Sequence, residues 1–115
     1  MTASRIDHAT FEALKETTGA EFAIELVDTF LEEAPAMLRD LRDALAAHDA
    51  DKFRRAAHSL KSNSNTFGAL TLGTMARELE ISGLSKALES GGKALDELAL
   101  EYSRVAAALT ELRHA

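Results

Sequence analysis

Residues 53–69 read FRRAAHSLKSNSNTFGA, and the apolar and small residues in this stretch recur at intervals of three and four. They are Phe53, Ala56, Ala57, Leu60, Ser64 and Phe67. This spacing is typical of a helix with one buried face. With Leu60 at the centre of that face and about 100° of rotation per residue, His58 lies roughly 160° away. The pattern therefore predicts a helix that buries one stripe and exposes a histidine.

The predicted neighbours of His58 on the solvent face are cationic or small and polar. They are Arg54 and Arg55 one turn before it, Lys61 and Ser62 one turn after it, and Asn65 two turns after it. Nearby cations stabilise an anionic group added to an imidazole, and a serine leaves room for a partner to approach the ring. The surroundings favour a phosphoryl-accepting histidine. Helical phase alone favours the alternative, an exposed histidine without a function.

Two helices are predicted before this stretch. The first is short, begins after Ser4 or Asp7 and ends at Gly19. The second covers roughly residues 21–48, and its apolar residues keep their helical phase past Pro35. We therefore expect a kink within one helix rather than two separate helices.

Two further helices are predicted after it. Near the end of the fourth helix, Ile81, Leu84 and Leu88 leave the phase of its inner stripe. They either pack on a different neighbour or form an exposed apolar patch. A Gly91-Gly92 pair precedes the last helix, whose apolar residues alternate three and four apart between positions 95 and 112.

These helices predict an all-α fold, an antiparallel up-down four-helix bundle with a short extra N-terminal helix as a lid at one end. We expect one domain over residues 1–115, because this length buries a core without disulfides and the chain has no cysteine. The start of the sequence does not resemble a signal peptide. The sequence also has no run of about 20 apolar residues, the length needed to span a bilayer. A cytoplasmic protein that does not enter a membrane is therefore expected.

The composition also weakens other functions. A formal net charge of −6 argues against nucleic-acid binding. Phosphate-binding loops, zinc helices and nucleophile elbows are absent from the sequence. A two-metal bundle needs two Glu-x-x-His pairs, and only Glu111 with His114 has this spacing. No bound metal is therefore expected.

The segment His58-Ser-Leu-Lys61-Ser62-x-Ser64-x-x-x-Gly68-Ala69 strongly resembles the motif of the histidine-phosphotransfer (HPt) domain family, His-x-x-Lys-(Gly/Ser) followed by Gly six residues later. The Glu33-Ala34-Pro35 interruption and the Leu79-Glu80 pair also look like this family. The resemblance covers nearly the whole chain.

The resemblance implies a role for each matching residue. His58 would accept the phosphoryl group on Nε2, and Lys61 would neutralise its charge. Gly68 would end the active helix in a tight turn. Glu80 would accept a hydrogen bond from the other ring nitrogen, although periodicity alone favours a solvated carboxylate there.

The resemblance also implies partners. The chain would be a free-standing, monomeric phosphocarrier without an ATP site, working with a hybrid histidine kinase and the receiver domains of response regulators. The receiver would supply Mg²⁺, and the chain would need no cofactor of its own. Docking is expected at Arg54, Arg55, Ser62, Asn65 and Gly68, with the apolar residues Ile6, Phe11 and Ile24 as further candidates. The alternative is a non-catalytic helical module that binds or inhibits a signalling kinase or receiver, with residues 81, 84 and 88 as its contact.

Overall fold

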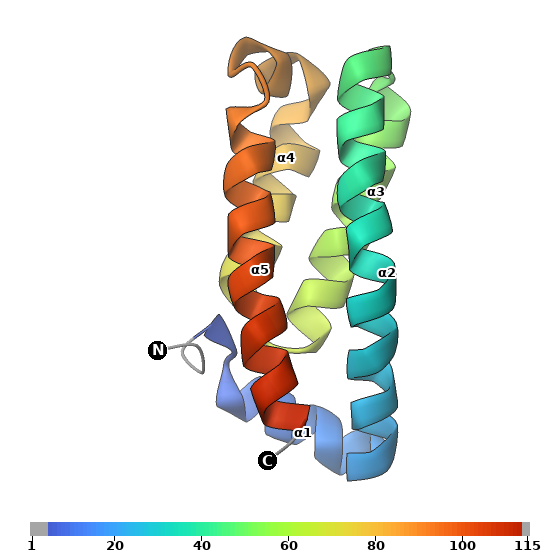
Figure 1. The fold of residues 1–115 in the computed structure, drawn as a ribbon, viewed down its shortest axis with the longest axis vertical. Helices are drawn as coiled ribbons and strands as arrows, with labels where there is room; N and C mark the ends of the chain where they lie inside the picture. Colours follow the sequence, from blue (N-terminus) through green and yellow to red (C-terminus); the bar gives the residue numbers. More distant parts are fainter. Residues whose placement is uncertain (1–4, 114–115) are drawn as a thin grey trace.

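The computed structural model describes residues 5–113, which form five helices and no strand. The helices are α1 (His8–Thr18), α2 (Ala20–Ala47), α3 (Ala50–Thr66), α4 (Leu70–Glu89) and α5 (Lys93–Arg113). Figure 1 shows α2 to α5 side by side, each antiparallel to the next along the chain, with α1 lying across one end. The predicted four-helix bundle with a short N-terminal helix is therefore confirmed.

The sequence signals for the helix ends agree with the structure where it is described. Asp7 caps α1, with its side chain accepting a hydrogen bond from the Thr10 amide at 3.1 Å. The other candidate for this cap, Ser4, lies outside the described residues. α2 runs through Pro35 as one helix, as predicted.

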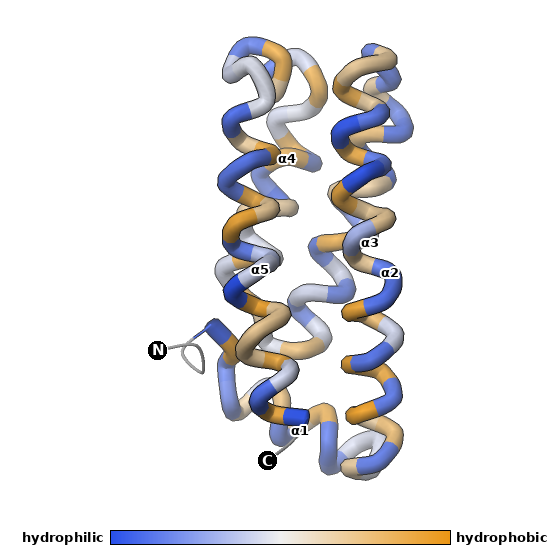
Figure 2. Tube along the Cα trace, in the orientation of Figure 1, coloured by the Kyte–Doolittle hydropathy of each residue, from blue (hydrophilic) through white to orange (hydrophobic). Residues whose placement is uncertain are grey.

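The apolar stripes of the helices pack against one another and form the core of the bundle. Hydrophobic segments alternate with hydrophilic ones along each helix in Figure 2. Phe53 and Leu60 on α3 are fully buried, as the stripe predicts. The ring of Phe30 on α2 lies 5.3 Å from that of Phe67 and 6.0 Å from that of Tyr102 on α5, measured between centroids. Because α3 packs its apolar stripe into this core, its opposite face is exposed to solvent.

Helix α1, the predicted lid, and the residues just before it include two predicted docking candidates that are buried. Ile6 is 2% exposed and Phe11 is 4% exposed, so neither is available to a partner. Ile24 is half-buried. The lid covers the open end of the core, and the Asp7 amide donates a hydrogen bond of 2.7 Å to the Gly68 carbonyl. Ile6 and Phe11 are buried because the N-terminal segment packs on the end of the core. Helical phase describes a single helix and cannot predict this packing.

The sequence left open whether Ile81, Leu84 and Leu88, near the end of α4, belong to the core or to an exposed apolar patch. Gly83 has φ 79° and ψ −177°, so the helix bends there. Leu84 beyond the bend is buried at 8% exposure, whereas Ile81 is 67% and Leu88 38% exposed. One residue of the three therefore belongs to the core, and two face solvent.

Candidate functional site

The register between α3 and α4 brings the candidate residues together. His58 on α3 faces Glu80 on α4, and Asn65 lies over Gly73, where an added Cβ would be 2.1 Å from the Asn65 Oδ1. Seven residues separate His58 from Asn65 and Gly73 from Glu80, so both contacts have the same antiparallel register. Gly73 therefore gives Asn65 the space it occupies between the helices. This role of Gly73 was not predicted from the sequence, although a glycine inside a predicted helix is a signal of close approach.

His58 has the predicted exposure and an ordered ring. Its side chain is 55% exposed, and Nδ1 lies 2.8 Å from the Glu80 Oε2. An ionised carboxylate only accepts hydrogen bonds, so this contact favours the tautomer with a proton on Nδ1 and a lone pair on Nε2. Within the described part of the chain, Nε2 has no hydrogen-bond partner. The ring is thus held by one nitrogen and exposes the other as a nucleophile.

Glu80 joins His58 to Lys61. The Lys61 ammonium lies 2.9 Å from the Glu80 Oε1, and both side chains are largely shielded, at 24% and 18% exposure. The hydrogen bond from Lys61 lowers the pKa of Glu80, and the bond with His58 lowers it further, against the opposing effect of desolvation. Glu80 therefore remains ionised at neutral and mildly acidic pH, where it holds the imidazole.

The three predicted cations near His58 all have carboxylate partners. Arg54 and Arg55 pair with Asp51, at 2.9 and 3.2 Å, while Lys61 pairs with Glu80. Asp51 stands three and four residues before the two arginines, so the sequence contained this signal. Three cations and two carboxylates leave an excess of one positive charge among these side chains. The basic surface is therefore weaker than the sequence suggests.

The remaining predicted docking residues divide by exposure. Ser62 and Asn65 are exposed on α3, on the same side as His58. Gly68 is buried under the lid, with φ 83°, so it belongs to the turn after α3 and not to the exposed face.

The described residues contain neither a metal-binding cluster nor a membrane-spanning helix. Residues 5–113 contain no group of three or more His, Cys, Asp or Glu side chains placed to hold a metal ion. Among the same residues, every helix is too short or too polar to cross a membrane. Of the pair Glu111 and His114, His114 lies outside the described residues.

A helical bundle with an exposed histidine, oriented by a carboxylate from the neighbouring helix, defines a class of phosphoryl-accepting modules. Residues 25–115 match the family model of the Hpt domain, and the chain belongs to that family. Members of this family are phosphocarriers rather than kinases, and they work with hybrid histidine kinases and response regulators. Histidine phosphotransfer in a phosphorelay is therefore the role of this chain.

Two solved structures have the same fold. Histidine-containing phosphotransfer protein B (HptB) from Pseudomonas aeruginosa PAO1 is 29% identical, with a TM-score of 0.87 over 96% of this chain and 95% of that one. The HPT domain of an Hpt sensor hybrid histidine kinase from Shewanella is 19% identical, with a TM-score of 0.75 over 96% and 94%, which shows the fold alone. A comparison with curated proteins gave no match.

Proposed function

We propose that His58 carries the phosphoryl group, accepting it from the phospho-aspartate of one receiver domain and passing it to the aspartate of another response regulator. The observation that supports this most strongly is the 2.8 Å contact between His58 Nδ1 and Glu80 on a ring that is 55% exposed. Transfer of radiolabelled phosphate from a phosphorylated receiver to this chain, in an acid-labile and base-stable form, tests the proposal.

The proposed step exchanges one bond to phosphorus for another. The Nε2 lone pair attacks phosphorus, the bond from phosphorus to the aspartate oxygen breaks, and the aspartate leaves as a carboxylate. The proton on Nδ1 stays between His58 and Glu80, whose negative charge stabilises the phosphorylated imidazolium. Transfer to the second receiver is the reverse of this step.

The chain contributes position and charge to the transfer. Lys61 pairs with Glu80, which also contacts His58, and in this proposal its charge is shared between Glu80 and the incoming phosphoryl group. We propose that Mg²⁺ comes from the receiver and that the carrier has no cofactor or ATP site of its own. Arg54, Arg55, Ser62 and Asn65, all exposed, would contact the receiver around its acidic pocket.

We further propose that the carrier acts in the cytoplasm as a monomer and without nucleic acid. Each transfer requires only one carrier and one receiver, because one exposed imidazole and one aspartate complete the reaction. The excess of carboxylates over cations in the sequence also disfavours a phosphate backbone as a partner.

Ser62→Leu is expected to slow phosphoryl transfer by about tenfold to a hundredfold, because an added isobutyl group one turn from His58 holds the receiver away from Nε2. Second-order transfer rates from a phosphorylated receiver measure the effect. Ser103→Leu, the same exchange at an exposed position of α5, serves as the control. Equal rates for wild type and Ser62→Leu would mean that receivers do not approach this face closely.

Glu80→Ala is expected to slow transfer by about tenfold to a hundredfold, because the imidazole loses the group that fixes its tautomer. Nitrogen NMR of His58 should show a larger fraction with the proton on Nε2 in the variant. Since the pKa of Glu80 is lowered, its contribution to the wild-type rate should persist between about pH 8 and pH 5 and be lost only as the carboxylate protonates at lower pH.

Glu80→Gln separates orientation from charge, because its amide oxygen still accepts a hydrogen bond. It should restore the Nδ1–H tautomer and part of the rate. A normal rate and an unchanged tautomer in Glu80→Ala would make Glu80 an ordinary surface carboxylate.

A further inference from the structure

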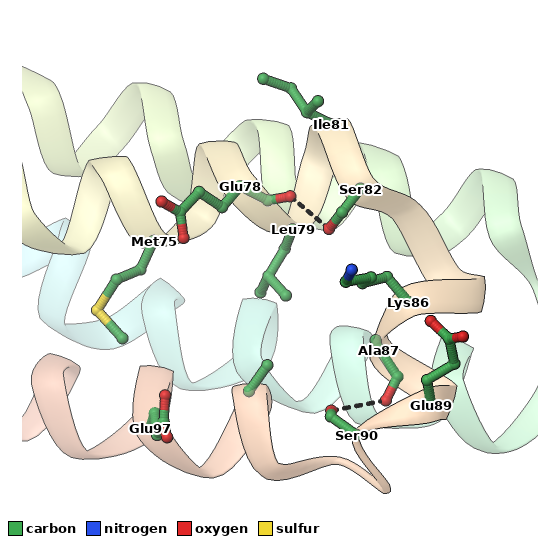
Figure 3. Close-up of a pocket in the computed structure, with 11 residues that line it drawn as sticks. Met75, Glu78, Leu79, Ile81, Ser82, Lys86, Ala87, Glu89, Ser90 and Glu97 are labelled. Carbon is green, nitrogen blue, oxygen red and sulfur yellow. Dashed lines mark hydrogen bonds between the residues drawn. The ribbon is translucent and has the colours of Figure 1, made fainter.

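A groove of about 710 Å³ lies between α4 and the beginning of α5. Its apolar lining includes Met75, Leu79, Ala87 and Ala94. Figure 3 shows Met75 and Leu79 projecting from α4 toward α5, whereas the Ile81 side chain points away from α5. The groove is therefore an apolar depression that the bundle leaves open to solvent.

The groove and the phosphoryl site lie on opposite sides of α4. Glu78 and Ser82 line the groove, and each is two residues from Glu80. At about 100° per residue, both lie roughly 160° around the helix axis from Glu80. A molecule in the groove would therefore leave His58 accessible to a receiver.

The bend at Gly83 shapes the far end of the groove. Its φ of 79° and ψ of −177° lie in a region that is essentially restricted to glycine. A Cβ at this position would meet no atom within 4 Å, so crowding does not account for the glycine. Beyond the bend, the chain turns back toward α5 and brings Lys86, Ala87 and Glu89 to the groove (Figure 3). The unusual backbone conformation thus maintains the opening.

The rim of the groove is acidic. Glu78, Glu89 and Glu97 line it, against the single cation Lys86. None of these three carboxylates forms an ion pair with another of the residues from 5 to 113. The two dashed hydrogen bonds in Figure 3 join hydroxyl groups to backbone carbonyls, at Ser82 and Ser90, so they do not use the carboxylates. The rim therefore has a net excess of two negative charges, and its three carboxylates are available to pair with the cations of a partner.

We propose that this groove binds a cationic amphipathic helix of a partner protein. A groove between two helices with an apolar floor fits the apolar face of a third helix, and the flexible thioether of Met75 adapts to its side chains. Lysine or arginine residues beside that face would pair with the three glutamates. A second copy of this chain would bring the same acidic rim, and an anionic lipid surface would be repelled by it.

The test uses the full chain labelled with ¹⁵N and a designed probe, an amphipathic Leu/Lys peptide of about 18 residues, or five helical turns. Its control is a Leu/Glu peptide with the same apolar pattern. We expect the amide shifts caused by the Leu/Lys peptide to concentrate in residues 75–97. The Leu/Glu peptide should bind at least about tenfold more weakly.

Two charge-matched double variants separate the groove from the general acidity of the protein. Glu78→Lys with Glu97→Lys should weaken binding of the Leu/Lys peptide by about tenfold or more. Glu32→Lys with Glu33→Lys, at exposed positions of α2, should stay within about twofold of wild type. Met75→Gln keeps the side-chain length, removes apolar surface and should weaken binding by about threefold to tenfold.

Several results would overturn the proposal. They are the absence of binding, shifts centred outside the groove, equal binding of both peptides, equal weakening by both double variants, and no effect of Met75→Gln. Sedimentation that reveals a dimer broken only by the groove variants would assign the face to a second copy instead. Phosphoryl acceptance by His58 should be unchanged in all these variants, and a failure of that acceptance in wild type would contradict the phosphocarrier role without bearing on the groove.

Discussion

His58→Gln is expected to reduce phosphoryl acceptance to the background of the assay while leaving the fold intact. The carboxamide nitrogen of glutamine has no available lone pair, so it cannot replace Nε2 as a nucleophile. The side chain of His58 is 55% exposed and outside the core, so the free energy of unfolding should change by no more than about 0.5 kcal/mol. Radiolabel transferred from a phosphorylated receiver, together with urea denaturation, measures both effects.

The matched control is His8→Gln, which removes another exposed histidine, on the lid. This variant should accept phosphate at the wild-type rate. Label on His58→Gln at the wild-type level would assign the phosphoryl group to a different residue. Loss of label together with loss of structure would show that His58 has a structural role that its exposure does not suggest.

Gly68→Ala is expected to lower the free energy of unfolding by about 2 to 4 kcal/mol. Its φ of 83° costs an alanine about 1 to 2 kcal/mol. The new Cβ would also lie 2.7 Å from the Asp7 carbonyl oxygen, a backbone atom that cannot rotate away. Relief of this contact would break the hydrogen bond from the Asp7 amide to the Gly68 carbonyl, at a further cost of about 1 kcal/mol. Urea denaturation measures the total.

Gly91→Ala isolates the cost of the backbone conformation. Gly91 also has a positive φ, 65°, but an added Cβ there meets nothing within 4 Å. It should lose only about 1 to 2 kcal/mol. Equal destabilisation of the two variants would mean that the contact between the lid and the turn after α3 contributes nothing to stability.

The exposure of His58 could be predicted because it depends on helical periodicity alone. Seventeen residues of α3 with a regular apolar stripe fix which face is buried, and a residue near the opposite pole must face solvent. The contact of Glu80 with His58, in contrast, could not be predicted from periodicity. Periodicity favoured a solvated carboxylate, and only the family resemblance suggested its contact with His58. That contact depends on the register of α3 against α4, in which Asn65 occupies the space beside Gly73.

The errors of the sequence analysis arose where a side chain depends on a second element. Ile6 and Phe11 were candidates for docking, yet both are buried at the end of the core. The placement of Leu84 and Leu88 was left open, because the helix axis changes direction at Gly83. Ile81 precedes the bend and is exposed on the side of α4 opposite its inner stripe. A period of 3.6 residues describes one straight helix, so it contains neither the packing of the lid nor the direction of the bend.

The most direct measurement is the location of the phosphorus in the loaded protein. The full chain is phosphorylated by a receiver domain, and ³¹P and ¹⁵N NMR identify the nitrogen bonded to phosphorus. The account predicts one phosphorus–nitrogen bond, at Nε2 of His58, with the Nδ1 proton still hydrogen-bonded to Glu80. Phosphorus on Nδ1, on any other residue, or on no residue after exposure to phosphorylated receivers would contradict it.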